Sequence, residues 1–163
     1  MFRVGDRIAH PMHGAGVVEG IEERGRDGRS ERYYVLRLLT GGLRLLVPVG
    51  TAEKLGLRTV LTPEAINAAL KTMPNLEAKM DPNWNRRYRE NMDRIRTGDL
   101  TELCRVIKGL SLRERETGLS TGERKMLWSA RQIMISEIRM ADKTDYAQAE
   151  AVLAAALGAC QTE

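Results

Sequence analysis

The two histidines of the chain, His10 and His13, are spaced as an H-x-x-H pair that could begin a metal site. A bound metal needs three or four ligands, and the neighbouring sequence supplies no Cys, Asp or Glu at ligand spacing. Pro11, Gly14 and Gly16 instead favour a bend between strands. We therefore expect neither a metal nor another cofactor.

Other patterns that could support catalysis are incomplete. The glycine-rich segment GAGVVEG leads into a predicted strand, whereas a dinucleotide-binding fingerprint opens a helix. The sequence has no P-loop and no G-x-S-x-G motif. Cys104 shares a predicted helix face with Leu100, Leu103 and Ile107, which is typical of a small core residue and not of a nucleophile. The sequence therefore argues against an enzyme.

The block DPNWNRRYREN, residues 81–91, places a tryptophan beside several arginines in a chain that is only 4% aromatic. At 100° per residue, one helix stripe contains Trp84, Tyr88, Met92 and Ile95, which favours a core role for the tryptophan. The arginines on the other faces favour phosphate contacts. A tryptophan in a first helical turn can also stay exposed and insert between base steps or stack on bases. The residues alone leave both roles open.

The first half of the chain has the pattern of a small β domain. Short strands are expected at residues 2–10, 14–23, 31–39 and 43–49. Asp27-Gly28 and Gly41-Gly42 supply tight-turn signals, and Pro48 belongs at an edge or a strand end because it cannot donate to a ladder. Residues 1–56 are therefore predicted to form a strongly bent antiparallel sheet or open barrel, an architecture typical of binding modules.

From Thr62 onward the hydrophobic period is helical. Thr62, Asp99 and Ser120 are suitable N-caps, and a Glu follows the last two at capping-box spacing. Helices are expected from residue 62 to about 71, from 83 or 84 to 98, from 99 to about 118, from 120 onward, and from about 145 to 158. Residues 61–160 are predicted to form a compact all-helical domain, so the fold class is α+β.

The composition is that of a globular protein, with 42% hydrophobic and 29% charged residues. No apolar run is long enough for a membrane span and the start shows no secretory signal, so we expect a cytoplasmic protein without a membrane partner, and a monomer. The net charge of +4 is concentrated in residues 79–139, with 14 Lys and Arg against 9 Asp and Glu. Such a cationic region suits nucleic acid or an acidic protein surface.

Three sequence blocks occur in this order along the chain: FRVGDRIAHPMHGAGVVEGIE, NWNRRYRENMDRIRTGD and RERETGLSTGERKMLWSARQIMISEI. Together they resemble the CarD/CdnL family of bacterial transcription regulators, from Met1 to about Ala156. The first block is also similar to a module of transcription-repair coupling factors, so the two helical blocks make the resemblance more specific.

The resemblance implies a Tudor-like N-terminal domain that docks on the RNA polymerase β subunit. It also implies a helical domain that contacts promoter DNA at the upstream edge of the melted region, in a nucleoid-associated protein. There Trp84 would insert into the minor groove and hinder closure of the bubble. The basic residues that would hold phosphates are Arg86, Arg87, Arg89 and Arg124. On this basis we expect an exposed Trp84, with the core stripe continued by Tyr88, Met92 and Ile95.

The resemblance also implies polymerase contacts on two strands. Arg24 matches a basic residue of the second strand, whereas the basic position before Val-Pro of the last strand is Leu46 here. Arg44, two residues earlier, lies on the same face of a strand and is a candidate substitute. The contact is therefore expected to use Arg24 with either Arg44 or a more apolar surface at Leu46.

The function that these expectations describe is binding without catalysis, in which the protein stabilises the promoter open complex. Two alternatives remain at this point. One is a sequence-nonspecific DNA-binding or architectural protein without a polymerase partner. The other is a protein–protein adaptor whose basic face meets an acidic partner and which has no DNA role.

Overall fold

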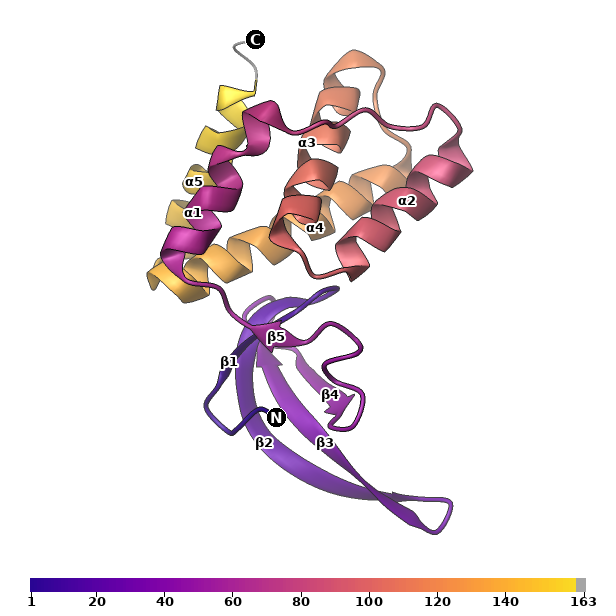
Figure 1. The fold of residues 1–163 in the computed structure, drawn as a ribbon, viewed down its shortest axis with the longest axis vertical. Helices are drawn as coiled ribbons and strands as arrows, with labels where there is room; N and C mark the ends of the chain where they lie inside the picture. Colours follow the sequence, from indigo (N-terminus) through magenta and orange to yellow (C-terminus); the bar gives the residue numbers. More distant parts are fainter. Residues whose placement is uncertain (161–163) are drawn as a thin grey trace.

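An antiparallel sheet of five strands is followed by five α-helices in the computed structural model, which describes residues 1–160 (Figure 1). The strands are β1 (Arg7–His10), β2 (Gly14–Arg26), β3 (Arg29–Leu38), β4 (Arg44–Pro48) and β5 (Arg58–Thr59), in the order β4-β3-β2-β1-β5. The helices are α1 (Pro63–Lys71), α2 (Trp84–Arg96), α3 (Leu100–Glu116), α4 (Thr121–Asp142) and α5 (Tyr146–Ala159), with a short 3₁₀ turn at Met73–Asn75. The predicted α+β class is confirmed.

The long β2–β3 hairpin dominates the sheet and curves away from the helices (Figure 1). Its turn has positive φ at both Asp27 (52°) and Gly28 (75°), the backbone that a tight two-residue hairpin turn requires. A register irregularity between Val18 and Gly20 adds local bend and twist. The tight-turn and bent-sheet predictions are therefore confirmed.

The sheet extends beyond the boundary at residue 56 that the sequence suggested. β5 pairs with β1, with Ile8 opposite Thr59 and Ala9 opposite Arg58. A strand of two residues is too short to show any alternation of apolar and polar positions, so it left no pattern in the sequence. The sheet of the structure therefore includes Arg58 and Thr59.

The helical half surrounds its own hydrophobic core, to which α1, α3, α4 and α5 contribute buried side chains. Three predicted N-caps are confirmed: Thr62 accepts a bond from Ala65 N, Asp99 caps α3, and Ser120 forms a full capping box with Glu123. None of the helices within residues 1–160 is long and apolar enough to cross a membrane.

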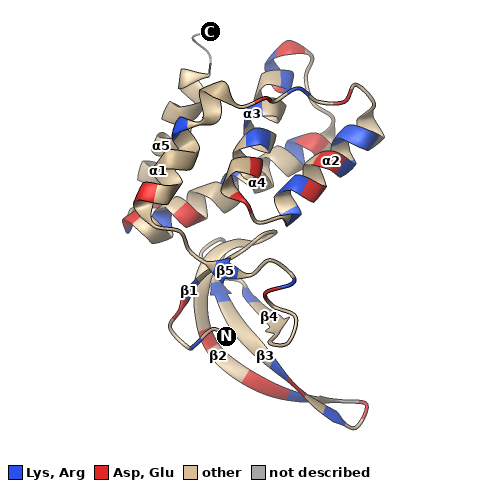
Figure 2. Ribbon diagram, in the orientation of Figure 1, with Lys and Arg blue, Asp and Glu red and all other residues tan. Residues whose placement is uncertain are grey.

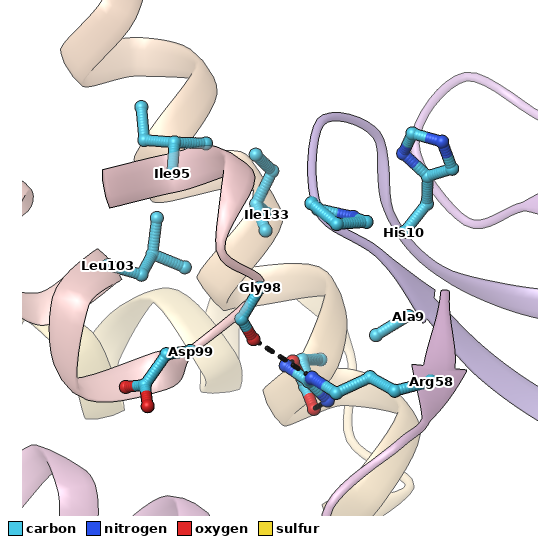
Figure 3. Close-up of a pocket in the computed structure, with 10 residues that line it drawn as sticks. Ala9, His10, Arg58, Ile95, Gly98, Asp99, Leu103 and Ile133 are labelled. Carbon is cyan, nitrogen blue, oxygen red and sulfur yellow. Dashed lines mark hydrogen bonds and ion pairs between the residues drawn. The ribbon is translucent and has the colours of Figure 1, made fainter. Parts of the chain in front are cut away.

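The two halves are joined by a polar interface that α4 makes with the sheet. Arg58 of β5 donates to the backbone oxygen of Gly98 at 2.9 Å (Figure 3). It also donates to both carboxylate oxygens of Glu137, at 2.6 and 2.9 Å. The Glu137 side chain is 1% exposed and that of Arg58 is 28% exposed, so this is a partly buried ion pair. Ser136 Oγ accepts a bond from Ala15 N at 2.9 Å. The orientation of the two halves is therefore defined by specific contacts.

Glycine is required where the β1–β2 bend meets α4. Gly14 has φ +86°, a left-handed backbone that disfavours a side chain. A Cβ at this position would also lie 2.4 Å from Ser136 Oγ, the atom that accepts the bond from Ala15. The glycine-rich motif near the N-terminus therefore serves close approach between the two halves.

Candidate nucleic-acid and polymerase interfaces

Trp84 is the first residue of α2, and its indole is held in place yet exposed to solvent. Asn83 caps the helix by accepting a bond from Arg86 N. The indole stacks on Tyr88 with ring centroids 5.1 Å apart and planes 21° apart, and its Nε1 donates to Ser120 Oγ at 2.9 Å. Even so, Trp84 is 42% exposed. The core role that the helical stripe favoured is therefore wrong, and the expected exposure of Trp84 is confirmed.

A series of polar contacts holds Ser120, the hydrogen-bond partner of the Trp84 indole, in place. Ser120 Oγ, which holds Trp84, lies 3.3 Å from Glu123 Oε2, and the same carboxylate oxygen accepts a bond from Ser120 N. The other oxygen, Oε1, accepts a bond from Arg87 Nε. Glu123 and Arg87 are 1% and 3% exposed. A buried ion pair therefore anchors the first turn of α4, and that turn orients the exposed tryptophan.

The structure does not support Arg87 as one of the expected phosphate contacts. Besides Glu123, its guanidinium donates to the backbone oxygens of Asp81 and Pro82, both at 3.1 Å. With its Nε and Nη1 donors used inside the protein and only 3% of its surface exposed, Arg87 is not placed to contact a DNA phosphate. The buried stripe of α2 is formed by Arg87, Asn91 and Ile95, whereas Tyr88 and Met92 are only half-buried. The helix is thus rotated from the orientation that its apolar residues suggested.

The ion pair also determines the charge state of Glu123. Burial raises the pKa of this carboxyl, but its hydrogen bonds to Arg87 and Ser120 outweigh burial and hold the pKa below the ordinary value of 4.5. Glu123 is therefore ionised at neutral pH and pairs with Arg87 as a carboxylate.

The other three predicted phosphate contacts are exposed arginines near Trp84. Arg86 and Arg89 lie on α2, and among the described residues neither has an ion-pair partner. Arg124 lies in the first turn of α4, 65% exposed and 4.0 Å from Glu114. Figure 2 shows basic residues toward both ends of α2, with acidic residues between them. The structure thus places the fixed indole and Arg86 in the first turn of α2, Arg124 in the adjoining first turn of α4, and Arg89 in the second turn of α2.

The predicted polymerase contacts lie on one face of the sheet. In β3, Tyr34, Leu36 and Leu38 are buried in the core, so the alternate positions face the other way. The cross-strand partners of these outward positions include the three predicted residues: Arg24 opposite Glu31, Leu46 opposite Val35, and Arg44 opposite Arg37. Cross-strand partners share a face of the sheet. Arg24 and Arg44 are separated by six β3 positions, or roughly 20 Å.

Arg24 and Arg44, the two arginines of this face that were predicted to contact polymerase, carry only weak surface pairs. Arg24 is paired with Glu22 at 3.2 Å, and Arg44 with Glu19 at 3.0 Å. Their side chains are 60% and 70% exposed. Exposed ion pairs contribute little to stability, so either guanidinium can exchange its partner for an acidic group on another protein.

The residues considered for metal binding or catalysis, His10, His13 and Cys104, are not among the predicted contact residues. Burial, with a smaller effect of His13, lowers the pKa of His10 to about 4, and its Nδ1 accepts a bond from Met12 N. Within residues 1–160 no group of three or more His, Cys, Asp or Glu side chains could hold a metal. Burial raises the pKa of the Cys104 thiol to about 12, so this buried residue is not a ready nucleophile.

Comparison with known proteins agrees with this division into a sheet and a helical domain. The model of the CarD C-terminal domain matches residues 68–154, and the model of the CarD-like/TRCF RID domain matches residues 2–61. The chain belongs to the CarD family. A CarD-family relative, "Putative transcription factor YdeB" of Bacillus subtilis (strain 168), is 32% identical over 140 residues, covering 86% of this chain and 92% of the relative. Membership of this family is consistent with a transcription regulator.

The segments matched to the two CarD-family models meet between the sheet and the helices. The N-terminal match ends at residue 61, after β5, and the C-terminal match begins at residue 68, within α1. What sequence reasoning missed in this CarD-family chain is the support of Trp84 by Ser120, Glu123 and Arg87. The capping box was visible, but nothing local showed that its serine would also accept a bond from an indole 36 positions earlier.

Proposed function

We propose that this CarD-family protein docks on the RNA polymerase β subunit through the outward face of its sheet and stabilises the promoter open complex. The helical half would contact DNA at the upstream edge of the melted region, with Trp84 as a wedge and with phosphate contacts from Arg86, Arg89 and Arg124. The observation that carries the proposal is the fixed but exposed indole of Trp84, 42% exposed beside these arginines. The match to the CarD-like/TRCF RID domain supports polymerase docking.

The proposed mechanism is a shift of the equilibrium between closed and open promoter complexes. A protein moves such an equilibrium only by its difference in affinity for the two states. An indole held by Tyr88 and Ser120 is already oriented, so little side-chain freedom is lost on insertion. Unstacking a base step costs a few kcal/mol, and a contribution of about 1–2 kcal/mol to the open state changes its population roughly five- to thirty-fold. Phosphate contacts read little sequence, which predicts action at many promoters.

Docking through the sheet would supply the DNA contact with a high effective concentration of protein. A tethered module binds its second partner as an intramolecular event, so weak DNA affinity is sufficient. The Arg58–Glu137 ion pair between the halves favours a fixed presentation of Trp84 over a freely swinging one.

Arg24→Glu is expected to weaken capture of RNA polymerase by the full-length protein, because it places a carboxylate on the proposed docking face. Arg32→Glu is the matched control: Arg32 lies next to the outward positions Glu31 and Tyr33 and so points to the opposite side of the hairpin. Pull-down of purified polymerase core enzyme measures both. Equal capture by the two variants would contradict the docking face. No capture by the unmodified protein would favour the DNA-binding or adaptor alternatives.

Duplex DNA binding is expected to be weak, salt-sensitive and largely indifferent to sequence. Each arginine–phosphate contact contributes about −0.9 to the slope of log K against log salt concentration, so three contacts predict a slope near −3. Arg86→Ala should reduce the magnitude of the slope by about one. Fluorescence anisotropy with unrelated duplexes over a range of salt concentrations measures this slope, and a flat response would rule out phosphate contacts.

A further inference from the structure

The second tryptophan of the chain, Trp128, is more exposed than the first. It lies on α4 and is 61% exposed. Within the described chain its side chain makes no hydrogen bond and no ring contact. Tryptophan usually buries a large apolar area, and its N–H usually finds a partner. Packing therefore does not account for a tryptophan at this position.

The side chains around Trp128 are cationic. Arg124, Lys125 and Arg131 are four positions before, three before and three after it, so they are its neighbours on the helix surface. The one acidic residue of this segment, Glu123, is buried and paired with Arg87, and so adds no negative charge to the exposed face. Within residues 1–160, neither Lys125 nor Arg131 has an ion-pair partner.

Apart from the buried Glu137, acidic residues return only at the end of α4, alongside Arg139 and Lys143. Asp142 closes the helix and Asp145 caps α5, so these carboxylates lie about three to four helical turns beyond Arg131. The surface of residues 121–132 therefore combines one large aromatic ring with the exposed Arg124 and Lys125 and the half-buried Arg131, and we call it the Trp128 face. Of these cations, Arg124 also lies 4.0 Å from Glu114.

We propose that the Trp128 face binds single-stranded DNA, with the indole stacking on an unpaired base and Arg124, Lys125 and Arg131 contacting the flanking phosphates. Stacking on an aromatic ring tolerates any sequence because every base has a π-face, and cations along the strand supply the remaining affinity. The inference rests on the proposed function, since an open promoter complex exposes unpaired strands next to the region assigned to Trp84.

Trp84 and Trp128 would make separate contacts. Gly122, in the first turn of α4, lies under the Trp84 ring, where a Cβ would be 3.6 Å from Trp84 Cζ2. Trp128 follows six residues later, roughly 9 Å along the axis and about 240° around it. The Trp84 ring, which belongs to α2, therefore lies against a different side of α4 from the one that carries Trp128, and the two rings cannot share one base.

Because the chain has only two tryptophans, each can serve as its own fluorescent reporter. In Trp84→Phe the remaining signal comes from Trp128, and we expect an oligo(dT) strand to quench it at low salt. In Trp128→Ala the affinity for oligo(dT) is expected to fall about five-fold or more. Trp128→Phe keeps a stacking ring and should retain most of the affinity. Val152→Ala, which shortens another exposed apolar side chain of the helical half, should change nothing.

The outcomes separate this inference from the proposed function. Unchanged Trp128 fluorescence, with normal oligo(dT) affinity in Trp128→Ala, overturns the inference even if Trp84 still responds to promoter duplex. If neither tryptophan responds to oligo(dT) or to duplex, the proposed DNA role fails as well. If poly-glutamate quenches Trp128 as strongly as oligo(dT), the face belongs to an acidic protein partner and the inference is wrong. Thermal melting of Trp128→Ala should match the unmodified protein, since the ring is exposed.

Discussion

Arg87→Ala is expected to lower the free energy of unfolding by about 3–5 kcal/mol, because it leaves the carboxylate of Glu123 buried without its partner. In a chain of this size the melting temperature should fall by roughly 6–20 °C. Arg86→Ala, one position earlier but fully on the surface, should change the free energy by no more than about 0.5 kcal/mol. Chemical denaturation of the two variants beside the unmodified protein measures the contrast.

Removing both partners should be less harmful than removing one. In Arg87→Met/Glu123→Met the buried charges are gone and the volume is largely kept, so part of the lost stability should return. The double variant also removes the support of Ser120, so Trp84 should lose its fixed orientation even where the fold is restored. If Arg87→Ala melts like Arg86→Ala, the buried ion pair is not a structural anchor.

The same pair gives a dependence on pH with a definite sign. The pKa of Glu123 is lowered in the folded protein, so the stabilisation is fully present above the ordinary value of 4.5 and is lost as the pH falls through the folded value. Without Arg87, burial dominates and raises the pKa of Glu123, so Arg87→Ala should recover relative stability on acidification. Denaturation at pH 7 and near pH 4 should therefore show a smaller gap between the two proteins in acid.

Trp84→Ala is expected to shorten the lifetime of the promoter open complex about five- to thirty-fold while leaving polymerase binding unchanged. Its cost to stability should be about 1–2 kcal/mol, from the lost stack on Tyr88 and the lost bond to Ser120. A fully buried tryptophan would cost about 3–5 kcal/mol. Open-complex decay after addition of a competitor, measured beside thermal unfolding, tests both expectations.

Arg89→Ala is the control variant for Trp84→Ala. A phosphate contact serves closed and open DNA nearly equally, so this variant should weaken DNA binding without a selective loss of open-complex lifetime. A fall in the melting temperature of Trp84→Ala as large as that of Arg87→Ala would place the indole in the core and defeat the wedge.

Local signals predicted most of the fold. Thr62 with Pro63, and Ser120 with Glu123, define helix starts through contacts within three residues, and Asp27-Gly28 defines a hairpin in the same way. The face of α2 could not be predicted, because a buried Arg87 is recognisable only once Glu123 is known to lie beside it. Since arginine is rarely buried without a partner, the apolar stripe was the better local choice.

The candidate surfaces were predictable only in part. Arg86, Arg89 and Arg124 are exposed as expected, and Arg24, Arg44 and Leu46 share a sheet face, because alternation along strands and turns along helices are local properties. The contacts between the halves join residues forty or more positions apart, such as Arg58 with Gly98 and with Glu137, and no short-range pattern encodes them.

Helix α4 contacts Trp84 near its N-terminal end and the sheet near its C-terminal end. The first turn of α4 meets Trp84 through Ser120, and Glu137, seventeen residues later, meets the sheet through Arg58. That separation is roughly 25 Å of helix, comparable to seven base-pair steps of B-form DNA. Under the proposed docking, α4 fixes the distance between the sheet, which is bound to polymerase, and Trp84. Trp84 would then contact the DNA at a fixed number of base pairs from the docking site, whatever the promoter sequence. Selection among promoters would then follow from how readily DNA opens at that distance.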